Sequence, residues 1–183
     1  LDVSGNSDIR DVVEKDKFFK SHVLGNYTDD IYTKGNLTYN HLVDGNSVEN
    51  YETKGNLIEE YIRGGNFDSS ILMNGNVNRK HETQGNNEKN FICRGHLNES
   101  FIRDKNAFQD ILIKGVKREN IKVGGNWYVE GITEGNGQTK YICKGNLREN
   151  YLREKNVYVE KIINGNETLL CETKGNCEIN YTC

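Results

Sequence analysis

Histidines, cysteines and carboxylates are the side chains of this chain that could perform catalysis or hold a metal ion. The histidines are His22, His41, His81 and His96, and none stands beside Cys or Asp at the spacing of a metal site. Carboxylates recur at Glu52, Glu82 and Glu172, in equivalent places of a repeat, as solvated residues do. Neither a nucleophile elbow nor a phosphate-binding glycine loop is present. The sequence therefore predicts a protein that is not an enzyme and that uses no metal and no cofactor.

The cysteines suggest a structural role and a compartment. Cys93 and Cys143 are five decades apart, too far to bridge, and we expect small buried side chains there. Cys171, Cys177 and Cys183 crowd the last thirteen residues, where one disulfide would pin the C-terminal end. Disulfides persist in oxidising compartments, and a chain starting at Leu1 is typical of a processed form. Secretion is the predicted location.

The charge balance excludes two classes of partner. The chain has 24 basic and 27 acidic residues and a formal net charge of −3, with the charges scattered along it. Nucleic acids and anionic membranes attract proteins with a clear basic excess, so we expect neither. No apolar run approaches the roughly 18 residues of a spanning helix.

A ten-residue repeat organises the whole chain. We number the ten positions of each decade as slots one to ten, so that Tyr51 occupies slot one. Of the eighteen complete decades, fifteen carry Gly in slot five and fifteen carry Asn in slot six, without a shift of register. Self-similarity of this kind indicates a repeat architecture. We expect a single domain over residues 1–183, with an N-terminal cap at 1–20, repeats at 21–170 and a cysteine-containing C-terminal cap at 171–183.

The composition of each decade selects the element. Slots one to three are largely apolar, slots four to six read Lys-Gly-Asn or a variant, and slot seven is apolar in about half the decades. Glycine every ten residues would interrupt a helix, whereas short strands separated by glycine turns fit this layout. Proline, which cannot donate to a strand ladder, is absent. The predicted fold is an all-β β-solenoid built from ten-residue Gly-Asn repeats.

The Gly-Asn pair itself is predicted to make turns and a ladder. Gly adopts positive φ readily and Asn tolerates it, as a sharp turn requires. Stacked Asn side chains can also hydrogen-bond along the axis as an amide ladder. The representative turn and ladder residues are Gly35, Asn36, Gly55, Asn56, Gly75, Asn76, Gly135, Asn136, Gly145 and Asn146.

The number of decades in one coil is the first open point. Similar aromatic pairs open consecutive decades at Tyr51/Tyr61, Phe91/Phe101 and Tyr141/Tyr151, spaced by four and then five decades. This mixed parity favours one decade per coil over two.

The identity of the exposed face is the second open point. Successive strand residues point to opposite faces, yet slots one and two are both apolar. One set would then form an outward row large enough to mark an interaction surface, unless the coil is wide enough to bury both. We assign slot one to this binding face: Tyr51, Tyr61, Ile71, Phe91, Phe101, Ile111, Ile121, Tyr141 and Tyr151.

The decade repeat, the terminal cysteines and the row of slot-one aromatics together resemble the short-repeat β-solenoids of insect ice-binding (antifreeze) proteins. The resemblance implies that Tyr51, Tyr61, Tyr141, Tyr151 and Tyr181, with Thr53, Thr83, Thr133 and Thr173 beside them, would match an ice surface. This chain lacks the Thr-x-Thr array, and its rank is broken by His and Lys161.

Two functions follow as expectations. The first is ice binding by a non-catalytic, secreted β-solenoid. The alternative is a structural or adhesive extracellular scaffold that self-associates, for example as a homodimer, or binds a host surface through the same face.

Overall fold

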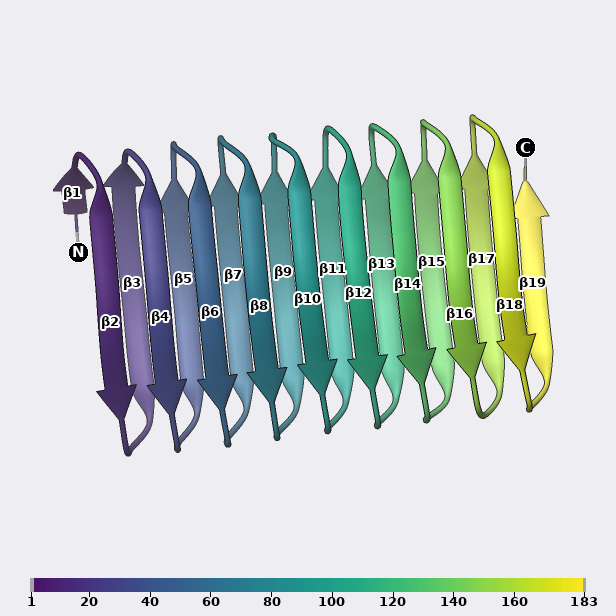
Figure 1. Ribbon diagram of the computed structural model, residues 1–183, viewed down its shortest axis with the longest axis horizontal. Coiled ribbons are helices and arrows are strands. Elements are labelled where there is room, and N and C mark those ends of the chain that lie inside the picture. The colour runs from purple at the N-terminus through teal and green to yellow at the C-terminus, as the bar shows by residue number, and fades with distance from the viewer. Residues whose placement is uncertain (1, 183) are drawn as a thin grey trace.

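The computed structural model describes residues 2–182 as an all-β molecule of two parallel sheets (Figure 1). Sheet A contains the ten odd-numbered strands and sheet B the nine even-numbered strands. The strands are β1 (Asp2–Ser4), β2 (Ser7–Val13), β3 (Lys17–Leu24), β4 (Tyr27–Thr33), β5 (Leu37–Val43), β6 (Ser47–Thr53), β7 (Leu57–Arg63), β8 (Phe67–Met73), β9 (Val77–Thr83), β10 (Asn87–Cys93), β11 (Leu97–Arg103), β12 (Ala107–Ile113), β13 (Lys117–Val123), β14 (Trp127–Thr133), β15 (Gly137–Cys143), β16 (Leu147–Arg153), β17 (Val157–Ile163), β18 (Glu167–Thr173) and β19 (Cys177–Thr182). The predicted β-solenoid is confirmed.

Each coil contains twenty residues, so the preference for one decade per coil is wrong. Each strand pairs with the strand after next, in a register of twenty: Leu37 lies beside Leu57, and Leu57 beside Val77. Consecutive decades therefore alternate between the two sheets, as the two layers in Figure 1 show. A ten-residue coil would have to turn twice within one decade, and the decade holds only one turn.

The strands are seven residues long in most coils, and this length sets the width of the core. Each runs from slot seven to slot three of the next decade. In the central coils, slots seven, nine, one and three are buried, and slots eight, ten and two face outward. A half-coil therefore sends four side chains inward, enough to fill the space between the sheets.

The glycines are required for close stacking and not for positive φ, which corrects the predicted reason. Among residues 2–182 only Gly5 has a positive φ, and no non-glycine residue does. A Cβ added to Gly145 would lie 2.6 Å from both the carbonyl carbon and the oxygen of Gly125, one coil below. Backbone from the neighbouring coil occupies the space of a side chain at this slot.

The asparagines form a ladder whose rungs differ from the predicted amide-to-amide bonds. The backbone N–H of Asn56 donates to Oδ1 of Asn36 at 2.9 Å, and that of Asn146 donates to Oδ1 of Asn126 at 2.9 Å. Two departures from Asn keep an acceptor: Asp16 Oδ1 accepts from Asn36, and His96 Nδ1 accepts from Val116. Each side chain thus ties its turn to the next coil.

The segments predicted as caps contain strands of the same sheets. β2 and β3 pair with β4 and β5, and β18 and β19 pair with β16 and β17, all in the register of twenty. No helix within residues 2–182 is long and apolar enough to cross a membrane.

Candidate functional site

The nine side chains predicted as the binding face lie in the core, and that prediction is wrong. Tyr51, Tyr61, Ile71, Phe91, Phe101, Ile111, Ile121, Tyr141 and Tyr151 are only 1–4% exposed. The physical reason is the strand phase: slot one lies two residues from slots nine and three and therefore points inward with them. No rank of slot-one tyrosines is available to a partner in the central coils.

The outward apolar side chains belong to slot two, which the sequence left as the alternative. On sheet B they form an unbroken series over five consecutive coils, which we name the aliphatic row: Leu72, Ile92, Leu112, Ile132 and Leu152. Ile92 and Ile132 are 40% and 42% exposed. The equivalent series on sheet A is interrupted by Glu82 and Lys122. Sheet B therefore carries the longer continuous apolar feature.

A shallow trough runs beside the aliphatic row. Its second wall is a series of acids, amides and a hydroxyl in slot ten, named here the acid–amide row: Ser70, Asn90, Asp110, Glu130 and Asn150. The two rows enclose about 890 Å³ of surface space. Nearby, the exposed ring of Phe108 and the half-buried ring of Tyr128 stack at 5.0 Å between centroids, and Arg148 lies 5.4 Å from the Tyr128 ring. The face thus combines polar and charged side chains with the aliphatic row and a neighbouring pair of stacked aromatic rings.

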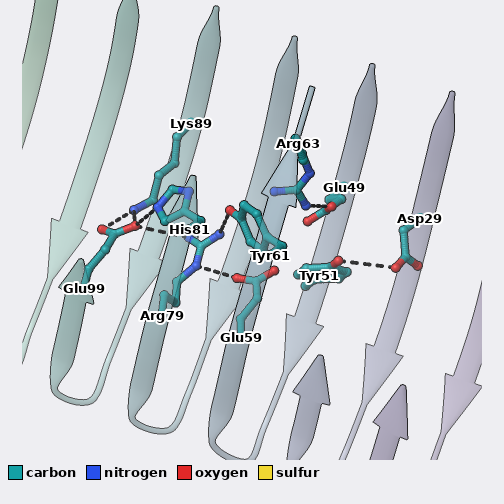
Figure 2. A network of polar contacts seen from close by, with 10 residues as sticks. All are labelled: Asp29, Glu49, Tyr51, Glu59, Tyr61, Arg63, Arg79, His81, Lys89 and Glu99. Carbon is teal, nitrogen blue, oxygen red and sulfur yellow. Dashed lines mark hydrogen bonds and ion pairs between the residues drawn. The ribbon is translucent and has the colours of Figure 1, made fainter. Parts of the chain in front are cut away.

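Inside the solenoid, slots nine, one and three build a buried polar network that the sequence did not predict (Figure 2). Glu59 Oε2 accepts from Arg79 Nε at 2.5 Å, and Arg79 Nη2 donates to the Tyr61 hydroxyl at 2.8 Å. Glu99 accepts from Lys89 at 2.5 and 2.6 Å and from His81 Nε2 at 2.8 Å. These side chains join β7 to β11 across both sheets.

The network continues toward the N-terminal coils. Arg63 forms an ion pair with Glu49, and both side chains are fully buried. The Arg63 guanidinium also lies 3.3 Å from the Tyr61 ring centroid and 3.8 Å from that of Phe67. Asp29 accepts hydrogen bonds from the hydroxyls of Tyr27 at 2.7 Å, Tyr51 at 3.3 Å and Tyr39. Aromatic faces and hydroxyls thus supplement the ion pairs.

Burial dominates the protonation of these groups. It raises the pKa of Asp29 above its ordinary value and lowers the pKa of Lys89 to about 8. Burial alone would raise the pKa of Glu99, but its cationic neighbours, Lys89 first, hold it well below the usual range. Burial also lowers the pKa of His81 well below its ordinary value, although the hydrogen bond with Glu99 opposes this.

Chemically, the network stabilises charge within the core, with no access for a substrate. The side chains of Glu49, Glu59, Arg63, Arg79 and Glu99 have no exposed surface. Two similar clusters follow: Lys117 with Glu119 and Tyr151, and Lys161 with Glu149. Among residues 2–182, no three His, Cys, Asp or Glu side chains gather as a metal site.

The cysteines do not form the predicted staple within the described residues. Cys93, Cys143, Cys171 and Cys177 are free thiols, and Cys183 lies outside the described residues. Cys93 and Cys143 are buried, as expected, and each donates to a turn carbonyl at 3.3 Å. The compartment inferred from a disulfide therefore stays a prediction.

The missed residues left a signal in the sequence. Glu59, Arg79 and Glu99 fill slot nine of decades two apart, with Arg63 and Arg103 in slot three. These charged residues stand an even number of positions from the aromatic residues of slot one and therefore point to the same face of the strand. They should have indicated that charged side chains twenty residues apart pair inside the core.

Comparisons with protein families, with curated proteins and with solved structures found no match for this chain.

Proposed function

We propose that this protein is a non-catalytic structural scaffold, a rigid β-solenoid that associates with a second copy through the face of sheet B. The observation that carries the proposal is the aliphatic row. Five consecutive coils present Leu or Ile outward in slot two, beside the polar row in slot ten. Single exposed aliphatic residues are common on proteins, whereas a continuous line of them marks an interaction surface.

A second copy fits this face because its rows have the same pitch. Neighbouring strands lie about 4.8 Å apart, so two aliphatic rows laid side by side meet residue for residue along their whole length. The acid–amide row beside it supplies hydrogen-bonding groups for the rim. Five coils cover less than a standard interface of about 1,600 Å², so we expect reversible association at micromolar or higher concentration.

Ice binding, the first expectation, loses four of the five tyrosines on which it rested, because Tyr51, Tyr61, Tyr141 and Tyr151 are buried and only Tyr181, in the terminal strand β19, is exposed. The exposed row that replaces them is aliphatic, and charged residues such as Asp110 and Glu130 flank it. The scaffold function therefore has the better support. The predicted secretion belongs to the same proposal, and finding the protein only inside the cells that make it would remove that part.

Sedimentation equilibrium of the full chain between about 1 μM and 1 mM tests the proposal. Wild type should show a concentration-dependent dimer, and Leu112→Lys should weaken it at least about tenfold by placing a charge in the apolar line. The matched control is Ile142→Lys, at the same slot on sheet A, where the side chain is 39% exposed. This control should dimerise like wild type.

Two results would overturn the scaffold function. A strict monomer at 1 mM removes self-association, as does equal weakening by both variants. Thermal hysteresis measured on the same samples should be absent. Hysteresis that Leu112→Lys abolishes and Ile142→Lys preserves would establish ice binding by sheet B in its place.

A further inference from the structure

The edge along which the chain passes from sheet B to sheet A carries a strip of cations that the proposed scaffold function does not use. Slot four at this edge holds Lys54, Asn74, Arg94 and Lys114 in four successive coils and Glu134 in the next, and Arg118 lies in slot eight of β13. The four cations are exposed. At the opposite edge, slot four of the corresponding coils holds Asp44, Gly64, Gln84 and Asp104. Over these coils, slot four is therefore more basic at this edge than at the opposite one, although the formal net charge of the chain is −3.

Three of these cations have no anionic partner among the residues that the structure describes. Lys114 forms an ion pair with Glu134 at 3.5 Å. Within residues 2–182, no ion pair involves Lys54, Arg94 or Arg118. Exposed cations that are held near one another without a counter-charge attract anions from solution.

The asparagine ladder at this edge leaves mainly hydrogen-bond donors facing outward. Asn56 Oδ1 accepts from Asn76 N–H, and Asn76 Oδ1 accepts from His96 N–H, both at 2.9 Å. His96 Nδ1 accepts from Val116 N–H at 2.9 Å, which places the imidazole proton on Nε2. The Nδ2 groups of the two asparagines and Nε2–H of His96 remain as donors. Such donors select a ligand that is rich in oxygen acceptors.

A trough beside the strip provides room for a polymer. It encloses about 600 Å³ and is lined by Asn56, Asn76, His96 and Arg118, with Ile58 and Val116 as apolar patches. Leu57, Val77 and Leu97 also line it, as do Asn78 and Asn98, which are joined by an Nδ2-to-Oδ1 hydrogen bond of 3.3 Å. Here the regular repeat departs from Asn at two successive coils, at His96 and Val116. Amides of this kind donate to and accept from hydroxyl groups.

We infer that this edge binds a linear acidic polysaccharide lying along the solenoid axis. Arg94, Arg118 and Lys54 would hold its carboxylate or sulfate groups, and the trough amides would bind its hydroxyls. From Lys54 to Lys114 the strip spans three coil spacings of about 4.8 Å each, so an extended chain of a few sugars can cover it. Single-stranded nucleic acid is the less suitable polyanion, because apart from His96 the trough lining contains no ring on which a base could stack.

Titration calorimetry of the full chain with heparin and with polygalacturonate tests the inference, with neutral dextran as the uncharged probe. Both acidic polymers should bind and dextran should not. The affinity should fall with salt, with a slope of log K against log[salt] of about −2 to −3 for three cations. Arg94→Glu/Arg118→Glu should weaken binding at least about tenfold.

The matched control removes the same number of charges at the opposite edge, with Lys105→Glu/Lys144→Glu, both exposed turn residues. This variant should bind the acidic polymers within about twofold of wild type. His96→Asn restores the asparagine of the ladder and should leave the fold unchanged. This second variant should weaken binding less than Arg94→Glu/Arg118→Glu does.

Equal loss in both double variants, or no binding of either acidic polymer, would overturn the inference. Binding of a single-stranded DNA oligonucleotide without binding of the polysaccharides would overturn it too, and would assign the strip to nucleic acid. These outcomes are independent of the dimer test, which concerns sheet B.

Discussion

At the scale of single residues, the repeated pair has two different physical tasks. Asn supplies an acceptor for the backbone N–H of the next coil, as Asn126 does for Asn146. Gly removes a side chain from a place where backbone already lies, as at Gly145 over Gly125. Close stacking, and not a preference for positive φ, favours glycine at this slot, although Lys15, Lys105 and Lys155 show that three coils accommodate a side chain there.

Replacing Gly145 by Ala should therefore destabilise the fold strongly. The added Cβ would lie 2.6 Å from the Gly125 carbonyl group and 2.8 Å from Asn126 N, all of them backbone atoms that cannot rotate away. We expect the free energy of unfolding to fall by at least about 2 kcal/mol, measured by urea denaturation.

Gly137→Ala is the matched control for that experiment. Its Cβ would meet only the two methyl groups of Val157, at 3.6 and 3.8 Å, which are ordinary contacts. In a strand, Ala should cost nothing or stabilise by about 0.5 kcal/mol through the lower entropy of the unfolded chain. Similar losses in the two variants would show that close stacking does not explain the glycines.

At the scale of elements, the two sheets are held together by a core that is unusually rich in charge. Arg63 on β7 pairs with Glu49 on β6, and Lys89 on β10 pairs with Glu99 on β11, each across the two sheets. A buried pair is expensive to desolvate, yet removing one member is worse than keeping both, because the other charge is left uncompensated. Such pairs also oppose slippage, because a shift of one coil separates them.

The pair of Glu49 and Arg63 gives a direct test. Glu49→Leu should lower the free energy of unfolding by roughly 3–5 kcal/mol, because it leaves the Arg63 guanidinium buried without a counter-charge. The double variant Glu49→Leu/Arg63→Met should regain most of that loss. Both are measured by urea denaturation.

The exposed pair of Lys80 and Glu60, 3.1 Å apart, is the control for this cycle. Glu60→Gln, which removes the carboxylate of this pair, should change the free energy of unfolding by less than about 1 kcal/mol. A double variant of Glu49 and Arg63 no more stable than the single one would show that the two charges do not compensate each other.

The sequence was sufficient to predict the strands and turns of this fold, but not the phase of its strands. Gly and Asn recur in every part of the chain, and their period alone indicates a β-solenoid. The choice between slots one and two depends on which side faces the core, and both sets are apolar: Tyr61 is buried while its neighbour Ile62 is exposed. Arg63 and Glu59 share the inward phase of Tyr61, and because charged residues are rarely buried, their positions do not reveal which phase faces the core.

The twenty-residue coil and the sites on the surface depend on information that one decade does not contain. Each decade looks alike, so alternation between two sheets is visible only in pairs such as Glu59 and Arg79, twenty residues apart. The strip at Arg94 and Arg118 was hidden for a related reason. A balanced net charge conceals cations that the coil gathers at one edge.

At the scale of the whole molecule, the solenoid is a stack in which each strand pairs only with its counterparts one coil away. The free energy of unfolding is then close to a sum of contributions from the coils, so a buried titratable group in one coil changes that total directly. His41 is 2% exposed, stacks on Tyr39 at 4.2 Å between centroids, and its Nδ1 lies 2.5 Å from Ser21 Oγ. Burial, aided by the charge of Arg63, lowers its pKa to about 2.

This depressed pKa makes the stability of the molecule fall in acid. Below the ordinary histidine pKa of about 6.5 the unfolded chain takes up a proton that the folded protein refuses, so unfolding is favoured as pH decreases. For His41 the loss between pH 7.5 and pH 5 should be about 2 kcal/mol, and His81 acts in the same direction. Asp29, with its raised pKa, opposes both, because the folded protein binds its proton more readily than the unfolded chain.

His41→Phe isolates the contribution of His41 to this pH dependence. The variant should lose the Ser21 hydrogen bond at every pH, at a cost of about 1 kcal/mol. The free energy of unfolding of the variant, measured by urea denaturation, should be lower than that of wild type at pH 7.5 and equal to it or higher by pH 5. A difference in this free energy that stays constant with pH would show that His41 takes up its proton in the folded protein.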